Sequence, residues 1–308
     1  MARTRFAPDH GLTARMTSVM FLLGAVFVAL IVILMFVLPV GWAPFIAIIG
    51  LGIAWGQWYF SDTVAMKAMR AREVTPQEAP ELHQMIDRLC ALADMPKPRV
   101  GVADVKVPNA FATGRSPNRS VVCVTTGILG LLTADEMEGV LAHELSHVAH
   151  RDVTVMTVAS TAGILAGMLS RGAQWGAFFG GGRRDNNNQG GLPIWLVVLV
   201  VSLVVYAVSF FLTRLLSRYR ELAADRAGAQ LTMKPRALGT ALQKISGGMN
   251  AIPTADLRAS SSMNAFFIAP AIKGVSLSQL TSTHPSLEQR LEQLARIEAD
   301  LSRPSDPA

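Results

Sequence analysis

Long uncharged apolar runs alternate along this chain with segments in which apolar and polar residues mix. The first run lies between Arg15 and Asp62, where no Asp, Glu, Lys, Arg or His occurs, and Pro and Gly residues within positions 39–44 interrupt it. A helix needs about 20 apolar residues to cross the hydrocarbon core of a bilayer. The pattern therefore predicts two membrane-spanning helices, at residues 17–38 and 42–60.

Two further apolar stretches, residues 153–170 and 192–212, flank a loop rich in Gly and Asn. The first stretch contains several Thr, Ser and Gly residues, so a buried or re-entrant pair of helices is an alternative to two full crossings. Arg183 and Arg184 also disfavour an outer location for the loop. We predict about four membrane-spanning helices in all.

The basic residues beside the first pair of spans predict the orientation of the chain. They lie before the first span and after the second, and the connection between the spans carries no charge. Because cytoplasmic flanks of membrane helices are enriched in Lys and Arg, both ends of this pair are expected in the cytoplasm. The residues concerned are Arg3, Arg5, Arg15, Lys67, Arg70 and Arg72.

The composition also indicates a membrane protein, since 51% of the residues are hydrophobic and only 16% are charged. The net charge of +6 comes from basic residues that mostly flank the apolar runs, so no nucleic-acid partner is expected. Cys90 and Cys123 belong to no CxxC pair. We expect them to be buried thiols in a reducing compartment, with a disulfide between them as the alternative.

The remaining segments predict a mixed α+β domain. Residues 76–94 carry apolar positions at helical spacing. Residues 99–105, 108–113 and 120–126 are predicted to be extended, because they alternate or are rich in β-branched residues. Pro285 is predicted to begin a final amphipathic helix.

One predicted helix carries the residues with the clearest chemistry. Thr133 and Glu136 have the spacing of a capping box, in which their side chains satisfy free amides at a helix start. Further along, His143, Glu144 and His147 form an HExxH pattern. Two histidines four residues apart share one helix face and can reach the same ion, while the glutamate can deprotonate a water molecule. The pattern predicts a zinc site.

A zinc site of this kind needs a third protein ligand. The metzincin pattern would place it at position 153, which is Val153 here. His150 is about 10.5 Å from His143 along a helix axis, too far to share the ion, and is expected on the surface or beside a ligand. Glu221 follows the last apolar stretch and is the predicted third ligand, with Asp225 orienting a ligating histidine. Ion pairs from these acids to nearby arginines are the alternative.

These residues predict metal-assisted hydrolysis of a peptide bond, with Glu144 as general base. A non-catalytic membrane adaptor held together by zinc is an alternative from another class, but structural zinc sites usually have four protein ligands. An intramembrane metalloprotease would carry HExxH inside an apolar span. Here charged residues precede and follow the motif.

Four segments together resemble the M48 peptidases: HELSHVAHRD at 143–152, SRYRELAAD at 217–225, VPNAFATG at 107–114 and THPSLEQR at 283–290. The layout is similar to that of the HtpX-type bacterial membrane proteases. The resemblance implies a zincin-like catalytic domain on the cytoplasmic side of the bacterial inner membrane, one zinc ion per chain, and damaged or misfolded membrane proteins as substrates under stress. A CAAX-type prenyl-protein peptidase would share the zinc residues but is expected to have more spans.

By this resemblance His143, His147 and Glu221 would bind zinc, Glu144 would act as general base, and Asp225 would contact a ligand. The predicted layout of the chain comprises a tail (1–16), a membrane hairpin (17–60), a first catalytic part (61–152), a second hydrophobic hairpin (153–213), a second catalytic part (214–301) and a tail (302–308).

The resemblance also implies roles for residues outside the HExxH helix. Asn109 and its neighbours would form an edge strand along the cleft, to which an extended substrate adds by main-chain hydrogen bonds. Phe111 would either line a side-chain pocket or belong to the core. His284 and Arg290 would lie near the active site, where His284 either stabilises the oxyanion or caps the helix that Pro285 begins.

Overall fold

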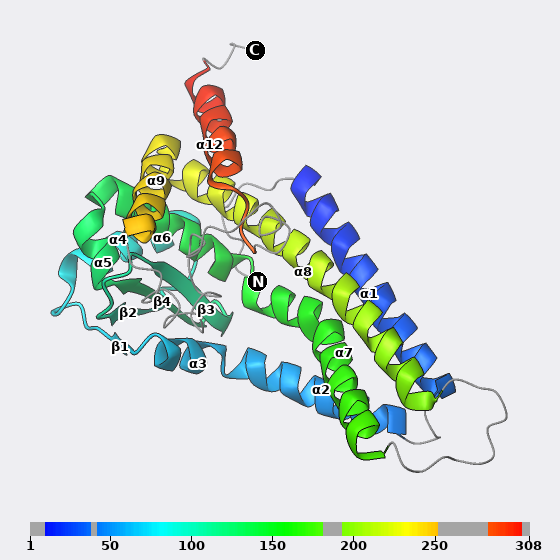
Figure 1. Ribbon diagram of the computed structural model, residues 1–308. Helices are drawn as coiled ribbons and strands as arrows, with labels where there is room; N and C mark the ends of the chain where they lie inside the picture. The colour runs from blue at the N-terminus through cyan, green and yellow to red at the C-terminus, as the bar shows by residue number, and fades with distance from the viewer. Residues whose placement is uncertain (1–9, 38–41, 181–192, 252–282, 304–308) are drawn as a thin grey trace. The chain divides into compact units, whose positions relative to one another are not determined.

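The computed structural model describes residues 10–37, 42–180, 193–251 and 283–303 (Figure 1). The chain divides into two compact units. We call residues 14–57 and 155–216 the helical unit, and residues 1–13, 58–154 and 217–308 the mixed unit.

The helical unit contains most of four helices. They are α1 (His10–Val37), α2 (Trp42–Tyr59), α7 (Asp152–Gly180) and the first part of α8 (Ile194–Thr232). Leu30 and Leu34 of α1, Leu165 and Leu169 of α7 and neighbouring residues of α8 form its buried cluster. Gly50 allows a close approach of α2, because a Cβ there would lie 1.9 Å from the Leu165 side chain.

Three helices in the described part of the chain are long and apolar enough to cross a membrane: His10–Phe36, Asp152–Gln174 and Ile194–Thr232. Large apolar side chains on them face outward, such as Phe21, which is 74% exposed. Outward apolar surface of this kind fits a lipid environment. The remaining predicted span, residues 42–60, coincides with the 18-residue helix α2.

The mixed unit is built on a four-stranded sheet with the order β1-β2-β4-β3. The strands are β1 (Ala71–Glu73), β2 (Arg99–Ala103), β3 (Ala110–Ser116) and β4 (Arg119–Thr125). β2 and β4 run parallel, and the other two neighbouring pairs are antiparallel. β1 and β3 are therefore the edge strands.

A tight hairpin joins β3 to β4, with Ala110 opposite Val124 and Thr113 opposite Val121. The register shifts between Gly114 and Ser116. Gly114 has φ +144°, and a Cβ there would lie 2.3 Å from the Arg119 carbonyl oxygen, so only glycine fits this position without strain.

Helices cover both faces of the sheet. The helices of the mixed unit are α3 (Ser61–Ala68), α4 (Pro80–Ala93), α5 (Thr126–Leu131), α6 (Ala134–Ala149), α9 (Pro235–Ala251), α12 (Leu287–Ser302) and the last part of α8. Val122 and Val124 of β4 join the cluster formed with α4 and α6, whereas Cys123 between them joins the α3 cluster. This alternation follows the two-residue period of a strand.

The predicted elements of the mixed unit are largely present with shifted ends. The helix predicted at 76–94 begins only at Pro80, and Leu92 on its presumed apolar face is 44% exposed. The last helix begins at Leu287 and is capped by Ser286, so the prediction that Pro285 begins it was wrong by two residues. The short elements α3 and β1 were not predicted.

Both cysteines are free and buried, as the first of the two alternatives predicted. Burial raises the pKa of Cys90 to about 11 and that of Cys123 to about 12. Both side chains are therefore thiols at neutral pH and act as small apolar groups in the core.

Candidate active site

The HExxH residues lie on α6, deep in the mixed unit. The capping box is present, because Thr133 accepts a hydrogen bond from the Glu136 amide and Glu136 accepts one from the Thr133 amide. Near the other end of α6, the Nε2 atoms of His143 and His147 lie 3.1 Å apart. The His143 side chain is 1% exposed and that of His147 is 16% exposed.

Glu221 of α8 completes the group. Its carboxylate oxygens lie 3.7 Å from Nε2 of His143 and 3.6 Å from Nε2 of His147. One ligand atom from each of the three residues lies within 4.8 Å of the other two. Glu221 lies on a helix later in the chain than α6, and this 39-residue helix also contains the last apolar stretch.

A close crossing of helices places Glu221 at this distance. Gly228, two turns further along α8, packs against α6, and a Cβ there would lie 2.8 Å from the backbone nitrogen of His143. Only the absence of a side chain lets the two helix backbones approach so closely.

Asp225 contacts His143. Its carboxylate lies 2.9 Å from Nδ1 of His143 and is itself fully buried. Arg290 of α12 donates two hydrogen bonds to the same carboxylate, at 2.7 and 2.6 Å. Burial would lower the pKa of Arg290, but the charge of Asp225 raises it above the ordinary value, so the guanidinium stays charged. The spacing from Glu221 predicted Asp225 near the site, the resemblance to the M48 peptidases implied the same for Arg290, and the two side chains are in contact.

Asp152 lies beside Nδ1 of His147, as Asp225 lies beside Nδ1 of His143. The sequence patterns did not predict this contact of Asp152. Its carboxylate lies 2.7 Å from Nδ1 of His147 and forms an ion pair with Arg220, the residue before Glu221. The sequence offered only their positions as a signal: Asp152 lies five residues after His147, and Arg220 directly precedes Glu221, the predicted third ligand.

The proton positions at the two histidines explain what the group can bind. Each Nδ1 faces a carboxylate, so the ring proton belongs there and each Nε2 carries a lone pair. Burial lowers the pKa of His143, which favours its neutral form. Two nitrogen lone pairs and the Glu221 carboxylate thus converge with no proton between them. This arrangement fits a cation.

Glu144 lies beside this group, 4% exposed. Burial raises the pKa of Glu144 to about 8, although a hydrogen bond with the Ala112 backbone of β3 opposes the shift. A nearby cation would favour the charged carboxylate and lower this pKa. A carboxyl group whose pKa lies near neutrality is suited to both accepting and donating a proton.

Two further predicted residues, Asn109 and His284, lie at different places in the mixed unit. Asn109 is fully buried immediately before β3, and its backbone exchanges hydrogen bonds with Thr125. Nδ1 of His284 lies 3.0 Å from the Glu221 carboxylate. The alternative that His284 caps the last helix was wrong, because Ser286 does so.

His150 and Phe111 do not contribute to the group formed by His143, His147 and Glu221. His150 is exposed at the end of α6, where its Nδ1 lies 2.8 Å from the Ser146 carbonyl oxygen. Phe111 is 4% exposed and packs with Ala65, Met69 and Cys123. Phe111 is therefore a core residue, the second of its two predicted roles.

Two histidines and a glutamate around a cation-sized space, with a further carboxyl group alongside, define a metal-dependent hydrolase site. Comparison with known proteins agrees. The model of "Peptidase family M48" matches residues 76–298. With this match over most of its length, the chain belongs to peptidase family M48, the metallopeptidases.

Individual relatives place the chain among the HtpX-type members of that family. It is 51% identical over 306 residues to "Protease HtpX homolog 1" of Streptomyces coelicolor, covering 99% of each chain. It is 50% identical over 303 residues to "Protease HtpX homolog" of Moorella thermoacetica, covering 97% of this chain and 98% of the relative.

A solved structure shares the fold. The crystal structure of S. mikatae Ste24p matches 93% of this chain with a TM-score of 0.52 at 16% sequence identity. This chain spans 66% of the length of that protein.

Proposed function

We propose that this protein is a zinc-dependent endopeptidase that hydrolyses peptide bonds of membrane or misfolded proteins. The observation that carries the proposal is the convergence of His143, His147 and Glu221 beside Glu144. Family membership supports the reaction class, and the relatives are named as HtpX proteases.

Zinc is the proposed ion because its usual ligands in hydrolases are two histidines and one carboxylate, with a fourth position left open. When bound, zinc supplies a positive charge that polarises the scissile carbonyl and acidifies water. His143, His147 and Glu221 would hold it.

The protein's own residues carry the remaining steps. Glu144 takes the proton of the attacking water on its carboxylate and passes it to the leaving amine nitrogen. Asp225 and Asp152 hold the two ligand imidazoles in the required tautomer. His284 contacts Glu221 through Nδ1, and we propose its Nε2 as a donor to the oxyanion.

The edge strand β3 is the proposed substrate-binding element. It borders the sheet, and the backbone of its residue Ala112 hydrogen bonds with Glu144. An extended polypeptide could pair with such an edge through main-chain hydrogen bonds, which read no particular side chain. This suits a protease of unfolded substrates.

For the membrane part we propose four spans, within residues 17–60 and 153–213, and a zincin-like catalytic domain formed by residues 61–152 and 214–301. Tails at 1–16 and 302–308 complete the layout. The three long apolar helices support this arrangement, and the basic flanks support a cytoplasmic N-terminus and catalytic domain. By analogy with HtpX proteases, the membrane would be the bacterial cell membrane.

The alternative functions are less well supported. A zinc-stabilised adaptor would need no open metal position and no buried acid like Glu144 beside it. A prenyl-protein peptidase is not favoured, because relatives aligned over nearly the full length are named as HtpX proteases.

The test compares full-length wild-type protein in detergent with Glu144→Gln. Both are loaded with zinc, and cleavage of an unfolded model protein is followed on gels. We expect equal zinc content and loss of cleavage in the variant. The matched control is Glu81→Gln, the same change at an exposed position of α4, which should cleave normally.

Two outcomes would contradict the proposal. Undiminished cleavage by Glu144→Gln would remove Glu144 from its role. Zinc binding without cleavage of any unfolded or membrane substrate by the wild type would favour the adaptor.

A further inference from the structure

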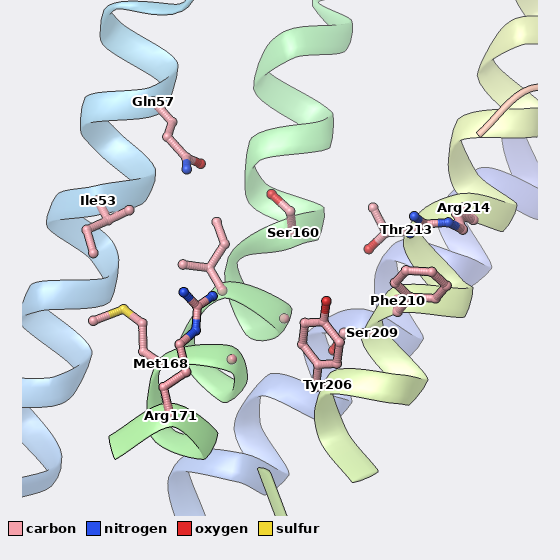
Figure 2. A pocket seen from close by; sticks show the side chains of 13 residues that line it. Ile53, Gln57, Ser160, Met168, Arg171, Tyr206, Ser209, Phe210, Thr213 and Arg214 are labelled. Carbon is pink, nitrogen blue, oxygen red and sulfur yellow. The ribbon is translucent and has the colours of Figure 1, made fainter. Parts of the chain in front are cut away.

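A groove of about 610 Å³ lies within the helical unit, between α2, α7 and α8 (Figure 2). It has no part in the proposed hydrolysis. Its lining mixes apolar and polar side chains on helices that are otherwise apolar. Figure 2 shows Ile53 and Gln57 on α2, Ser160, Met168 and Arg171 on α7, and Tyr206, Ser209, Phe210, Thr213 and Arg214 on α8.

The groove is positively charged. Arg171 and Arg214 line it, and no acidic residue does so within the described ranges. The Arg214 guanidinium stacks on the Phe210 ring at 3.3 Å. Arg171 is exposed on a helix apolar enough to cross a membrane, and the described part of the chain shows no ion pair for it. A guanidinium in such a helix is costly unless an anion or water accompanies it.

A buried hydroxyl group lies in the same groove without a partner. Ser209 is 1% exposed, and its Oγ has no hydrogen bond to any residue that the structure describes. A hydroxyl group in lipid normally bonds to a carbonyl of its own helix or to a ligand. An oxygen-rich anion in the groove would supply the missing acceptor.

Glycines make room for such a ligand. Gly163 and Gly167 lie one helical turn apart on α7 and face α8. A Cβ on Gly163 would lie 3.4 Å from Ser209, and one on Gly167 would lie 3.6 Å from the Tyr206 ring and 3.9 Å from Nη2 of Arg171. Larger side chains at these positions would fill the space beside the Arg171 guanidinium.

We propose that this groove binds one anionic phospholipid. Its phosphate would lie between the Arg171 guanidinium and the Ser209 hydroxyl. Its acyl chains would lie against Ile53, Ile164 and Met168.

Two observations favour a lipid over other anions. The groove joins fixed positive charge to apolar walls, which matches an amphiphile with one anionic group. In addition, Met168 lies one helical turn before Arg171 on α7, so the groove places an apolar side chain beside the Arg171 guanidinium (Figure 2). Hydrocarbon packed against Met168 would therefore lie close to a phosphate bound at Arg171.

The test measures lipid retained by full-length protein after delipidation in detergent. The protein is incubated with phosphatidylglycerol, with phosphatidylcholine of the same chains, or with inorganic phosphate, and bound lipid is counted by native mass spectrometry. We expect one phosphatidylglycerol per chain, held at least about tenfold more tightly than phosphatidylcholine, because a guanidinium pairs best with an anionic headgroup.

Variants locate the site. Arg171→Gln and Ser209→Ala should each reduce phosphatidylglycerol retention, Arg171→Gln by about tenfold or more. Gly167→Leu should also reduce it by filling the groove. Gly172→Leu is the matched control, because Gly172 is exposed on the same helix and an added Cβ meets no atom within 4 Å. Circular dichroism and zinc content show that each variant is folded.

Three outcomes would overturn the proposal. Folded Arg171→Gln and Ser209→Ala could retain as much phosphatidylglycerol as wild type. Inorganic phosphate could displace the lipid completely at millimolar concentration, which would indicate a simple phosphate site. A photocrosslinker at Met168 could capture an unfolded membrane peptide that phosphatidylglycerol does not displace, which would indicate a peptide site.

Discussion

Nδ1 of His147 lies 2.7 Å from the carboxylate of Asp152, which in turn pairs with Arg220. Asp152, the first residue of α7, thus contacts a histidine near the end of α6, and Arg220 of α8 pairs with Asp152. Asp225 and Arg290 repeat the arrangement at the other histidine of the motif. Each imidazole of the motif therefore contacts a carboxylate that also pairs with an arginine.

Asp152→Asn should weaken zinc binding. The amide loses the charge that supports the Nδ1 proton of His147, and loss of such a partner typically lowers metal affinity by about 10–100-fold. Competition with a chelator measures the affinity, and cleavage should fall with it at limiting zinc. Asp87→Asn is the control, since Asp87 is an exposed carboxylate paired with Lys97. Equal affinities of Asp152→Asn and wild type would refute the role.

Arg290→Met should destabilise the mixed unit strongly. It leaves the buried charge of Asp225 without its main partner, and breaking a buried ion pair in this way costs about 3–5 kcal/mol. The thermal unfolding midpoint in detergent should fall by several degrees. Arg296→Met on the same helix is the control, because Arg296 is exposed and its ion pair with Glu292 lies at the surface. A midpoint no lower than that of the control would contradict the prediction.

Gly228→Ala should separate α8 from α6. The added methyl group would lie 2.8 Å from the His143 nitrogen, so the helices must move apart at a cost of about 1–3 kcal/mol. Because Glu221 moves with α8, zinc affinity should fall together with stability. Gly247→Ala on α9 has open space around it and should be neutral or stabilising. Identical behaviour of the two variants would show that the close crossing does not matter.

Cys90 and Cys123 should resist alkylation in the folded protein. Their pKa values, raised to about 11 and about 12, leave roughly 100-fold and 1,000-fold less thiolate below pH 9 than a thiol of pKa 9 would have. Raising the pH from 7 to 8 increases labelling of both the folded and the denatured protein, but labelling of the folded protein should be slower by about these factors at each pH. Mass spectrometry after iodoacetamide treatment, with and without denaturant, measures this. Rapid labelling of the native protein would contradict it.

The site was predictable from the sequence where spacing alone determines geometry. His143 and His147 are four residues apart, so a helix must present them together. Glu221 followed from the need for a third ligand. The contact of Asp152 with Arg220 was not predictable, because it depends on how the chain returns along α8 after 67 intervening positions.

The longer helices and strands of the fold were also predictable from the sequence, but the short ones were not. Period-2 and helical patterns identified the longer elements, whereas α3 and β1 are too short to carry a period. The continuity of α8 was missed because polarity changes sharply after residue 212. No Gly or Pro interrupts the helix there, so it continues through the change.

Within the mixed unit, α8 also links the packing of Gly228 to the position of Glu221 through the helical repeat. Each residue of an α-helix turns the next by about 100° around the axis, so residues seven apart lie on nearly the same face. Gly228 packs against α6 and Glu221 lies seven residues before it, so the same face of α8 makes the close crossing and carries the carboxylate. Inserting or deleting one residue between them would leave the composition of the helix nearly unchanged, yet would turn the carboxylate away from the two histidines by more than a quarter of a circle. Evolution of this segment is thus constrained in length as well as in chemistry.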